Sequence, residues 1–157
     1  MPSDLGSDVA LTRYVGAPAA APLDFAHSWG TLDLAVAPRV AGLRTTESAG
    51  LATVSGRANL AQALILRLLT PRGSLAALGH AGYGSRLVEL VGRRNDVPTR
   101  NLARLFVVEA LSQEPRATLR DLTVDTDPDS PDVVRISFAV LPVGDPDPLA
   151  LSLELAP

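Results

Sequence analysis

Glycines gather at residues 79–84, where the sequence reads Gly-His-Ala-Gly-Tyr-Gly, a composition that could cradle a phosphate group. Such a loop normally follows a buried strand, keeps a fixed order of glycines and often supplies a lysine. Here the preceding segment reads as a loop, the glycine spacing differs, and all 14 basic residues of the chain are arginine. We therefore expect no nucleotide site and predict a connector.

Two features resemble metal sites at first sight. Residues 125–130 (Asp-Thr-Asp-Pro-Asp-Ser) start like a calcium loop, but Ser130 replaces the glycine of the sharp turn and Ile136 replaces the bidentate glutamate. His27 and His80 are the only histidines, and they lack the spacing of a metal-binding pair. We predict a solvated hairpin turn at 125–130, and we expect neither a metal nor a cofactor.

Catalytic groups are present in the sequence, but not in a catalytic arrangement. Ser85 and His80 with an aspartate would supply the side chains of a triad, yet nothing in their spacing supports that geometry. Glu109 and Glu114 lie about 140° apart around an ideal helix. They would therefore not face one glycosidic bond, as a hydrolase requires. We expect the protein not to be an enzyme.

The triplet Glu114-Pro115-Arg116 stands at the end of a long, mostly apolar segment that is predicted to be a helix. Proline lacks an amide hydrogen and disfavours helical geometry in the residue before it, so the chain should turn sharply here. One interpretation is a helix-to-strand corner with an ion pair worth about 0–1 kcal/mol if exposed. The other is a rigid presentation of both charges, each to a partner chain. The residues alone leave both interpretations open.

The helices that precede this triplet should position it. A long, mostly apolar helix is predicted to open at Asp96 or Thr99 and to continue to the proline of the triplet. A second helix is predicted at residues 57–69, and its apolar positions extend well beyond one stripe, so it must be covered on more than one side. A short helix is predicted at residues 86–91, capped by Ser85.

Period-two patterns predict strands before and after these helices. The strands are expected at residues 31–37, 51–54, 117–125, 133–141 and 149–155. In the fourth of them, Ile136, Phe138 and Val140 should share one face. We therefore predict an α+β fold, with central helices packed on a mixed or antiparallel sheet and a C-terminal β-meander.

The composition of the 157-residue chain fits one domain and a flexible arm. Residues 1–27 are rich in proline and alanine and cannot bury enough apolar surface to offset the entropy of ordering, so we expect a flexible arm at 1–27 and a domain at 28–157.

A net charge of −3 without a basic stripe argues against nucleic-acid binding. No apolar run reaches the roughly 18 residues that span a membrane, and no secretion signal is visible, so a cytoplasmic protein is expected.

Three sequence segments occur in an order and at a spacing similar to those of one known family. They are residues 59–73, the Tyr-Gly-Ser-Arg-Leu of residues 83–87 and the Gln-Glu-Pro-Arg of residues 113–116. Together they are similar to the gpW/lysozyme-like baseplate wedge family. This family includes the sheath-initiator protein of contractile phage tails and its counterparts in type VI secretion and extracellular contractile injection systems. Residues 29–34 also resemble the family's opening strand, apart from an inserted Leu32.

The resemblance implies a non-catalytic structural subunit of a baseplate, assembled in the cytoplasm into a contractile particle. It would dock to the core bundle of the baseplate wedge and template the first ring of sheath protein by strand addition. Inner-tube or hub proteins are further candidate partners. In this family the triplet is associated with wedge assembly, so Glu114, Pro115 and Arg116 are candidate partner-binding residues. The lysozyme label implies no site that cleaves the cell wall.

Two other functions stay open at this point. A small anti-adaptor protein that binds a response regulator shares the same fold resemblance, so a regulatory binding module is one alternative. A peptidoglycan hydrolase is the other. Possible interface residues are aromatic or arginine side chains: Trp29, Arg67, Arg72, Tyr83, Arg100 and Arg104.

Overall fold

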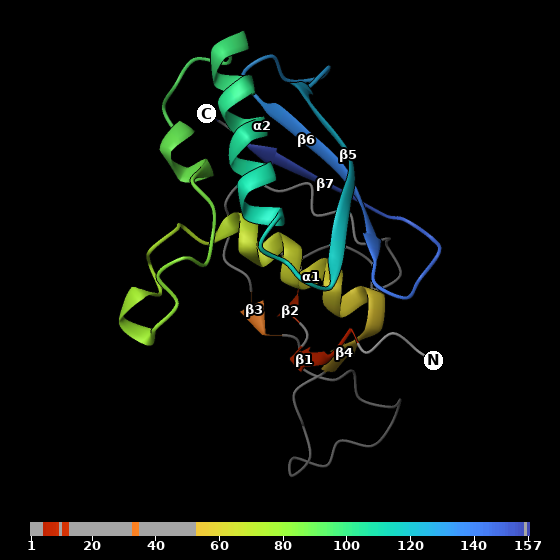
Figure 1. Ribbon diagram of the computed structural model, residues 1–157. Coiled ribbons are helices and arrows are strands. Elements are labelled where there is room, and N and C mark those ends of the chain that lie inside the picture. Colours follow the sequence, from red (N-terminus) through yellow and green to blue (C-terminus); the bar gives the residue numbers. More distant parts are fainter. Residues whose placement is uncertain (1–4, 10, 13–32, 35–52, 156) are drawn as a thin grey trace, which may run out of the picture.

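Two helices lie against one face of a three-stranded antiparallel sheet (Figure 1). The computed structural model describes residues 5–9, 11–12, 33–34, 53–155 and 157. In chain order the elements are β1 (Ser7–Val9), β2 (Leu11–Thr12), β3 (Asp33–Leu34), β4 (Thr53–Ser55), α1 (Gly56–Leu69), the 3-10 turns η1 (Ala76–Leu78) and η2 (Leu87–Leu90), α2 (Val97–Leu111), β5 (Ala117–Thr126), β6 (Val134–Pro142) and β7 (Leu149–Leu155). The predicted α+β class with a C-terminal meander is confirmed.

The sheet has the strand order β5-β6-β7, and each strand is antiparallel to its neighbour. In β6 the side chains of Ile136, Phe138 and Val140 are buried, as their spacing predicts, and the residues between them are only partly buried. The register of β5 shifts between Leu119 and Asp121. One face of the meander is therefore an apolar platform for the helices.

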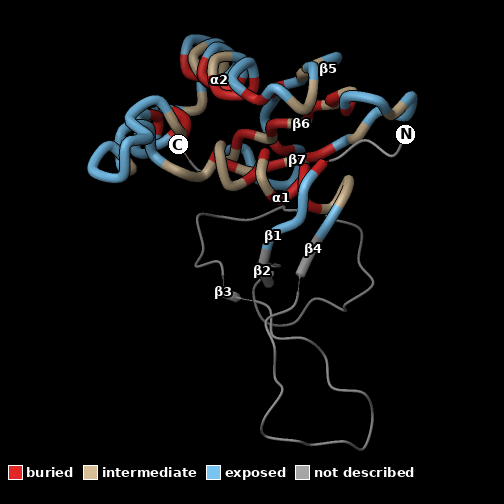
Figure 2. Tube along the Cα trace, turned by 60° about the horizontal axis from the view of Figure 1, so that its bottom comes forward, coloured by how far each residue is buried: buried red, intermediate tan, exposed pale blue. Residues whose placement is uncertain are grey.

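Helix α1 is covered on several sides, as its broad apolar surface requires. It packs against α2, η2, β4 and β7. Its buried apolar side chains are Leu60, Ala61, Leu64, Ile65 and Leu68. Each fully buried leucine contributes about 1.5–3 kcal/mol. In Figure 2 the buried residues lie where the two helices and the sheet face one another.

Helix α2 begins where the sequence predicts and ends earlier than predicted. The side chain of Asp96 accepts a hydrogen bond from the Thr99 amide at 2.9 Å, which identifies Asp96 as the cap. The helix ends at Leu111, because the amide of Glu114 bonds three residues back as the chain tightens before the proline. Among the described residues, no helix is long and apolar enough to cross a membrane.

Residues 5–9, which belong to the segment predicted as a flexible arm, contact the rest of the described chain. Strand β1 pairs antiparallel with β4, and Leu5 is only 3% exposed. One leucine in a polar, proline-rich segment gives no periodic hydrophobic signal, so the burial of Leu5 could not be predicted from the sequence pattern.

Two predicted strands lie only partly within the described residues. The strand predicted at residues 31–37 overlaps β3, which pairs with β2. The strand predicted at residues 51–54 overlaps β4. Trp29, a predicted interface residue, lies outside the described part of the chain, as do most of residues 1–27.

Candidate functional site

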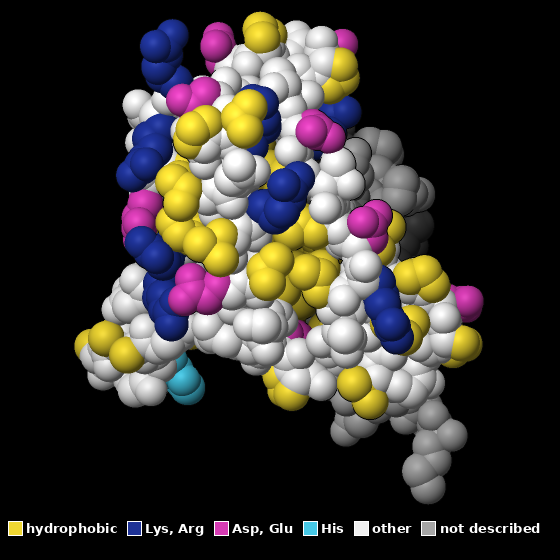
Figure 3. Space-filling view, turned by 45° about the horizontal axis from the view of Figure 1, so that its top comes forward, with side chains coloured by type: hydrophobic (Ala, Val, Ile, Leu, Met, Phe, Trp, Pro, Cys, Tyr) yellow, Lys and Arg dark blue, Asp and Glu magenta, His cyan; other side chains and the backbone are white. Residues whose placement is uncertain are grey.

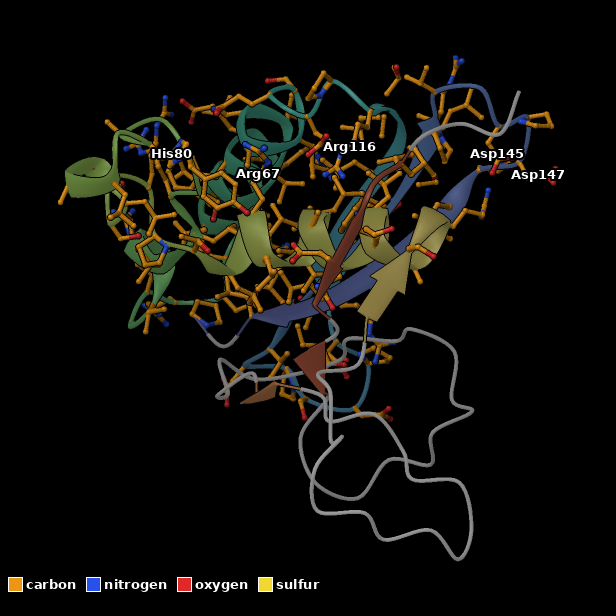
Figure 4. The ribbon with its side chains drawn as sticks, turned by 90° about the horizontal axis from the view of Figure 1, so that it is seen from below. Arg67, His80, Arg116, Asp145 and Asp147 are labelled. Atoms are coloured by element: carbon orange, nitrogen blue, oxygen red, sulfur yellow. The ribbon has the colours of Figure 1, made fainter. Side chains whose placement is uncertain are left out.

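The carboxylate of Glu114 lies inside the protein, between the end of α2 and the start of β5. Its side chain is only 4% exposed. Arg116 donates from Nε to Oε1 at 2.7 Å and from Nη2 to Oε2 at 3.2 Å. Arg67 of α1 donates to the same Oε2 at 3.5 Å. One carboxylate therefore joins two arginines from different elements, both labelled in Figure 4.

Arg116 also reaches the start of the chain. Its Nη1 donates to the backbone carbonyl of Leu5 at 3.0 Å, and the side-chain amide of Asn59 donates to the same oxygen at 2.9 Å. At Gly6, φ is +75° and an added Cβ would lie 3.3 Å from Nδ2 of Asn59, so glycine permits this close approach. The arginine of the triplet thus connects the N-terminal segment to the corner between α2 and β5.

The guanidinium of Arg67 lies over the ring of Tyr83, with its carbon 4.6 Å from the ring centroid. Such a cation–π contact is worth about 1–2 kcal/mol when it is partly desolvated. The Nε of Arg67 is buried and has no hydrogen-bond partner among the described residues. We refer to Asn59, Arg67, Tyr83, Glu114 and Arg116 as the corner cluster.

Burial and charge act in opposite directions on the pKa values of the corner cluster. Burial raises the pKa of the Glu114 carboxyl, but the hydrogen bonds and charge of Arg116, with the charge of Arg67, outweigh it and hold the pKa below its ordinary value. The bond with Glu114 in turn raises the pKa of Arg116. Burial is the main cause that raises the pKa of Tyr83. At neutral pH Glu114 is therefore held as a carboxylate next to the two arginines.

The lowered pKa of Glu114 predicts that the corner cluster weakens in acid. A carboxyl whose pKa is lower in the folded than in the unfolded chain stabilises the fold above its unfolded pKa, ordinarily 4.5, and loses that contribution as the pH falls through the folded value. We expect the difference in urea midpoint between wild type and Glu114→Gln to be largest near neutral pH and to shrink below about pH 4.5. Other carboxyls are common to both proteins, so a difference that stays constant with pH would contradict this account.

The loop that carries the tyrosine of the cluster is closed at its base by Ser85. The Ser85 amide donates to the carbonyl of Thr70, and the Arg72 amide donates to the carbonyl of Ser85, each at 2.8 Å. The Ser85 hydroxyl donates to the carbonyl of Leu68 at 2.6 Å and accepts from the amide of Leu87 at 3.2 Å. The predicted helix at residues 86–91 is a single 3-10 turn whose cap position is Arg86, so Ser85 lies one residue before the cap that was predicted for it.

The remaining predicted interface arginines lie outside the corner cluster. Arg72 forms an exposed ion pair with Glu109. Arg100 donates to the side-chain oxygen of Asn95 at 2.9 Å. Arg104 is exposed on α2. The cluster therefore gathers only part of the predicted set around the triplet.

The geometry favours a structural corner over the presentation of both charges to partner chains. Both oxygens of Glu114 are engaged by arginines of the same chain. Arg116 differs, because its side chain keeps 31% of its surface exposed. Pro115 is exposed and turns the chain between them. Only the arginine and the proline of the triplet are accessible from outside.

Two parts of this site were not predicted. The carbonyl of Leu5 is a backbone group distant in sequence, and no residue pattern points to it. The role of Asn59 could have been anticipated in part, because a buried amide side chain near the start of an apolar helix must find a hydrogen-bond partner. Its actual partner, Leu5, lies 54 residues away.

The described residues form no cluster of metal ligands, and the two glutamates considered as a catalytic pair lie in different surroundings. No group of three or more described histidine, aspartate and glutamate side chains could hold a metal ion. Glu109 pairs with Arg72 at the surface, whereas Glu114 lies in the corner cluster. The two glutamates therefore point to different partners.

No protein-family model matches the sequence, and no curated protein matches it significantly. Among solved structures, the fold resembles the crystal structure of a protein from Geobacter sulfurreducens described as a "putative tail lysozyme", with a TM-score of 0.52 and 19% sequence identity. The superposition covers 60% of this chain and 85% of that one. The likeness is one of fold.

Proposed function

We propose that this protein is a non-catalytic structural subunit in the baseplate of a contractile, tail-like particle assembled in the cytoplasm. The observation that carries the proposal is the fold likeness to a protein described as a "putative tail lysozyme". The three sequence segments between residues 59 and 116, which occur in the same order as in the baseplate wedge family, also support it. The corner cluster supports it as well, because Glu114 is engaged in structural contacts and is not available for catalysis. Its partners would be baseplate wedge proteins and the sheath protein, with inner-tube or hub proteins as further candidates.

The sheath protein would join by strand addition at the C-terminal sheet. Both β5 and β7 are outer strands. Strand β5 contains Arg120, Asp121 and Asp125 and a shift in register, all features that discourage edge pairing. Strand β7 contains a single charged residue, Glu154. An added strand forms main-chain hydrogen bonds with such an edge, and we therefore propose β7 as the receiving edge.

The triplet would act in wedge assembly by fixing the shape of the corner. Glu114 orients the guanidinium of Arg116 through two hydrogen bonds. The exposed part of Arg116 is then held in one place before a partner arrives, which lowers the entropy lost on binding. A wedge protein would contact Arg116 and Pro115, with Glu114 acting through the arginine.

Affinity purification from native lysate, with mass spectrometry of the bound proteins, tests this proposal. Tagged wild type should recover wedge and sheath proteins, and Arg116→Ala should recover severalfold less wedge protein. Arg116→Lys keeps the charge but not the two-nitrogen contact, so its recovery should be intermediate. Arg57→Ala, which removes an ion pair with Asp145 at the start of α1, is the control and should match wild type. Recovery of a response regulator, of the bait alone, or of equal wedge protein with Arg116→Ala would contradict the proposal.

A further inference from the structure

A row of charged side chains crosses the outer face of the sheet, which is the face opposite the helices. Asp125 of β5 pairs with Arg135 of β6, and Arg135 pairs with Glu154 of β7. Each of the three is next in sequence to buried residues that face the helices, and neighbouring side chains of a strand point to opposite faces. The order of charges across the sheet is therefore acid, base, acid.

The arginine in the middle of this row is shared by several carboxylates. Arg135 donates a hydrogen bond from Nη2 to Asp127, whose side chain is only 5% exposed. The same Nη2 lies 3.6 Å from Oε1 of Glu154, which is longer than an N–H···O hydrogen bond. Asp125 lies directly across from the arginine on its other side. Three carboxylates thus lie near one guanidinium, and Glu154 is held less closely than Asp127.

The arginines of the helical side do not compensate this row. Arg100 of α2 donates to the hydroxyl of Thr126 at 3.3 Å, but Thr126 pairs with Val134, which is fully buried in the core. Other arginines line one edge of the face seen in Figure 3, with acidic side chains between them. Among the described residues, Glu154 forms an ion pair only with Arg135. The charge of the row is therefore negative overall.

The row ends at β7, the edge that we propose for strand addition. Glu154 is the only charged residue of β7, and 30% of its side-chain surface is exposed. The other residues on its face, Ala150 and Ser152, are small. The helical face of β7 is apolar and buried, and its residues there are Leu151, Leu153 and Leu155. A strand at this edge would meet buried leucines on one face and small side chains with a single acid on the other.

We propose that the sheath strand added to β7 carries a lysine or arginine directly across from Glu154, between apolar residues that face α1. The inference rests on the proposed function and specifies the chemistry of the partner at that edge. Opposite charges directly across neighbouring strands stabilise the pair, and like charges destabilise it. A slip of one residue would move the basic side chain to the helical face, among the leucines. Glu154 therefore selects both the partner strand and its register.

The ratio of sheath to wedge protein in an affinity purification tests this inference. Tagged variants are purified from the native host, and both partners are measured by quantitative mass spectrometry. Glu154→Gln removes the charge at nearly unchanged size and should lower the ratio about threefold. Glu154→Lys opposes the charge of the partner and should lower the ratio about tenfold. Asp125→Lys makes the same reversal at the other end of the row, so it is the control and should keep the wild-type ratio.

The outcomes separate this inference from the proposed function. An unchanged ratio with Glu154→Lys overturns the inference, while recovery of wedge and sheath proteins still supports the proposed function. An equal loss with Asp125→Lys also overturns it, because the loss would then come from breaking the charge row within this chain. If wild type recovers neither wedge nor sheath protein, the proposed function is contradicted and the inference falls with it.

Photo-crosslinking identifies the strand itself. A benzophenone amino acid replaces the exposed Ala150, with the exposed Thr123 of β5 as the control position, and the crosslinked peptide is sequenced. We expect position 150 to capture a sheath segment in which apolar residues alternate with others that include one lysine or arginine. Changing that basic residue to glutamate in the sheath protein, together with Glu154→Lys, should restore the ratio of sheath to wedge protein. No capture at position 150, a captured segment without a basic residue, or no restoration by the double reversal would overturn the inference.

Discussion

Replacing Glu114 by alanine is expected to lower the free energy of unfolding by about 3 kcal/mol. The change leaves the guanidinium groups of Arg67 and Arg116 near each other without the carboxylate that balances them. The side chain of Arg67 is only 12% exposed, so water cannot replace the lost partner well. Urea denaturation followed by circular dichroism measures the loss as a lower midpoint at unchanged slope.

Glu109→Ala is the matched control for this experiment. Glu109 lies on α2, five residues before Glu114, and also pairs with an arginine, Arg72, but the two side chains are 38% and 36% exposed. Exposed pairs contribute about 0–1 kcal/mol. The control should therefore stay within about 1 kcal/mol of wild type. Similar losses in the two variants would contradict a special role for the buried carboxylate.

Gly84→Ala is expected to cost a comparable amount, about 3 kcal/mol. The φ angle of Gly84 is +102°, and an added Cβ would lie 2.4 Å from the carbonyl oxygen of Thr70 and 3.0 Å from the amide nitrogen of Arg72. Both are backbone atoms, so the base of the loop must move. The hydrogen bond from the Ser85 amide to Thr70 would then be strained. Thermal unfolding should show a lower Tm.

Gly79→Ala separates crowding from backbone strain. Gly79 also has a positive φ of +84°, but no atom lies within 4 Å of the place where its Cβ would be. It should cost only the strain of a left-handed alanine, about 1–2 kcal/mol. If Gly84→Ala were no more costly than Gly79→Ala, the close approach at the base of the loop would have no energetic role.

Much of the fold could be predicted from short-range patterns. The alternation of Ile136, Phe138 and Val140 identifies a half-buried strand, because neighbouring side chains of a strand point to opposite faces. Asp96 precedes an apolar helix and caps it, as its residue type favours. The end of α2 at Leu111 was predicted less accurately. A proline constrains the residues before it, so the last turn tightens ahead of the proline.

The corner cluster could be predicted only in part. The turn at Pro115 follows from local chemistry. The burial of Glu114 does not, since it depends on Arg67, which lies 47 residues earlier in the chain. The same holds for the bond between Arg116 and Leu5, because contacts across the chain leave no periodic trace. Local sequence thus predicts the elements, and the packing of one element against another determines which charges become internal.

The bond from Arg116 to the carbonyl of Leu5 has a kinetic consequence. It joins residues 111 positions apart, and closing so large a loop costs chain entropy that nearer contacts do not. Contacts within the hairpins and between neighbouring helices should therefore form first. A contact made after the folding barrier slows unfolding and hardly changes the folding rate. Breaking this bond should therefore speed unfolding and leave the folding rate nearly unchanged, so it contributes to the lifetime of the native state.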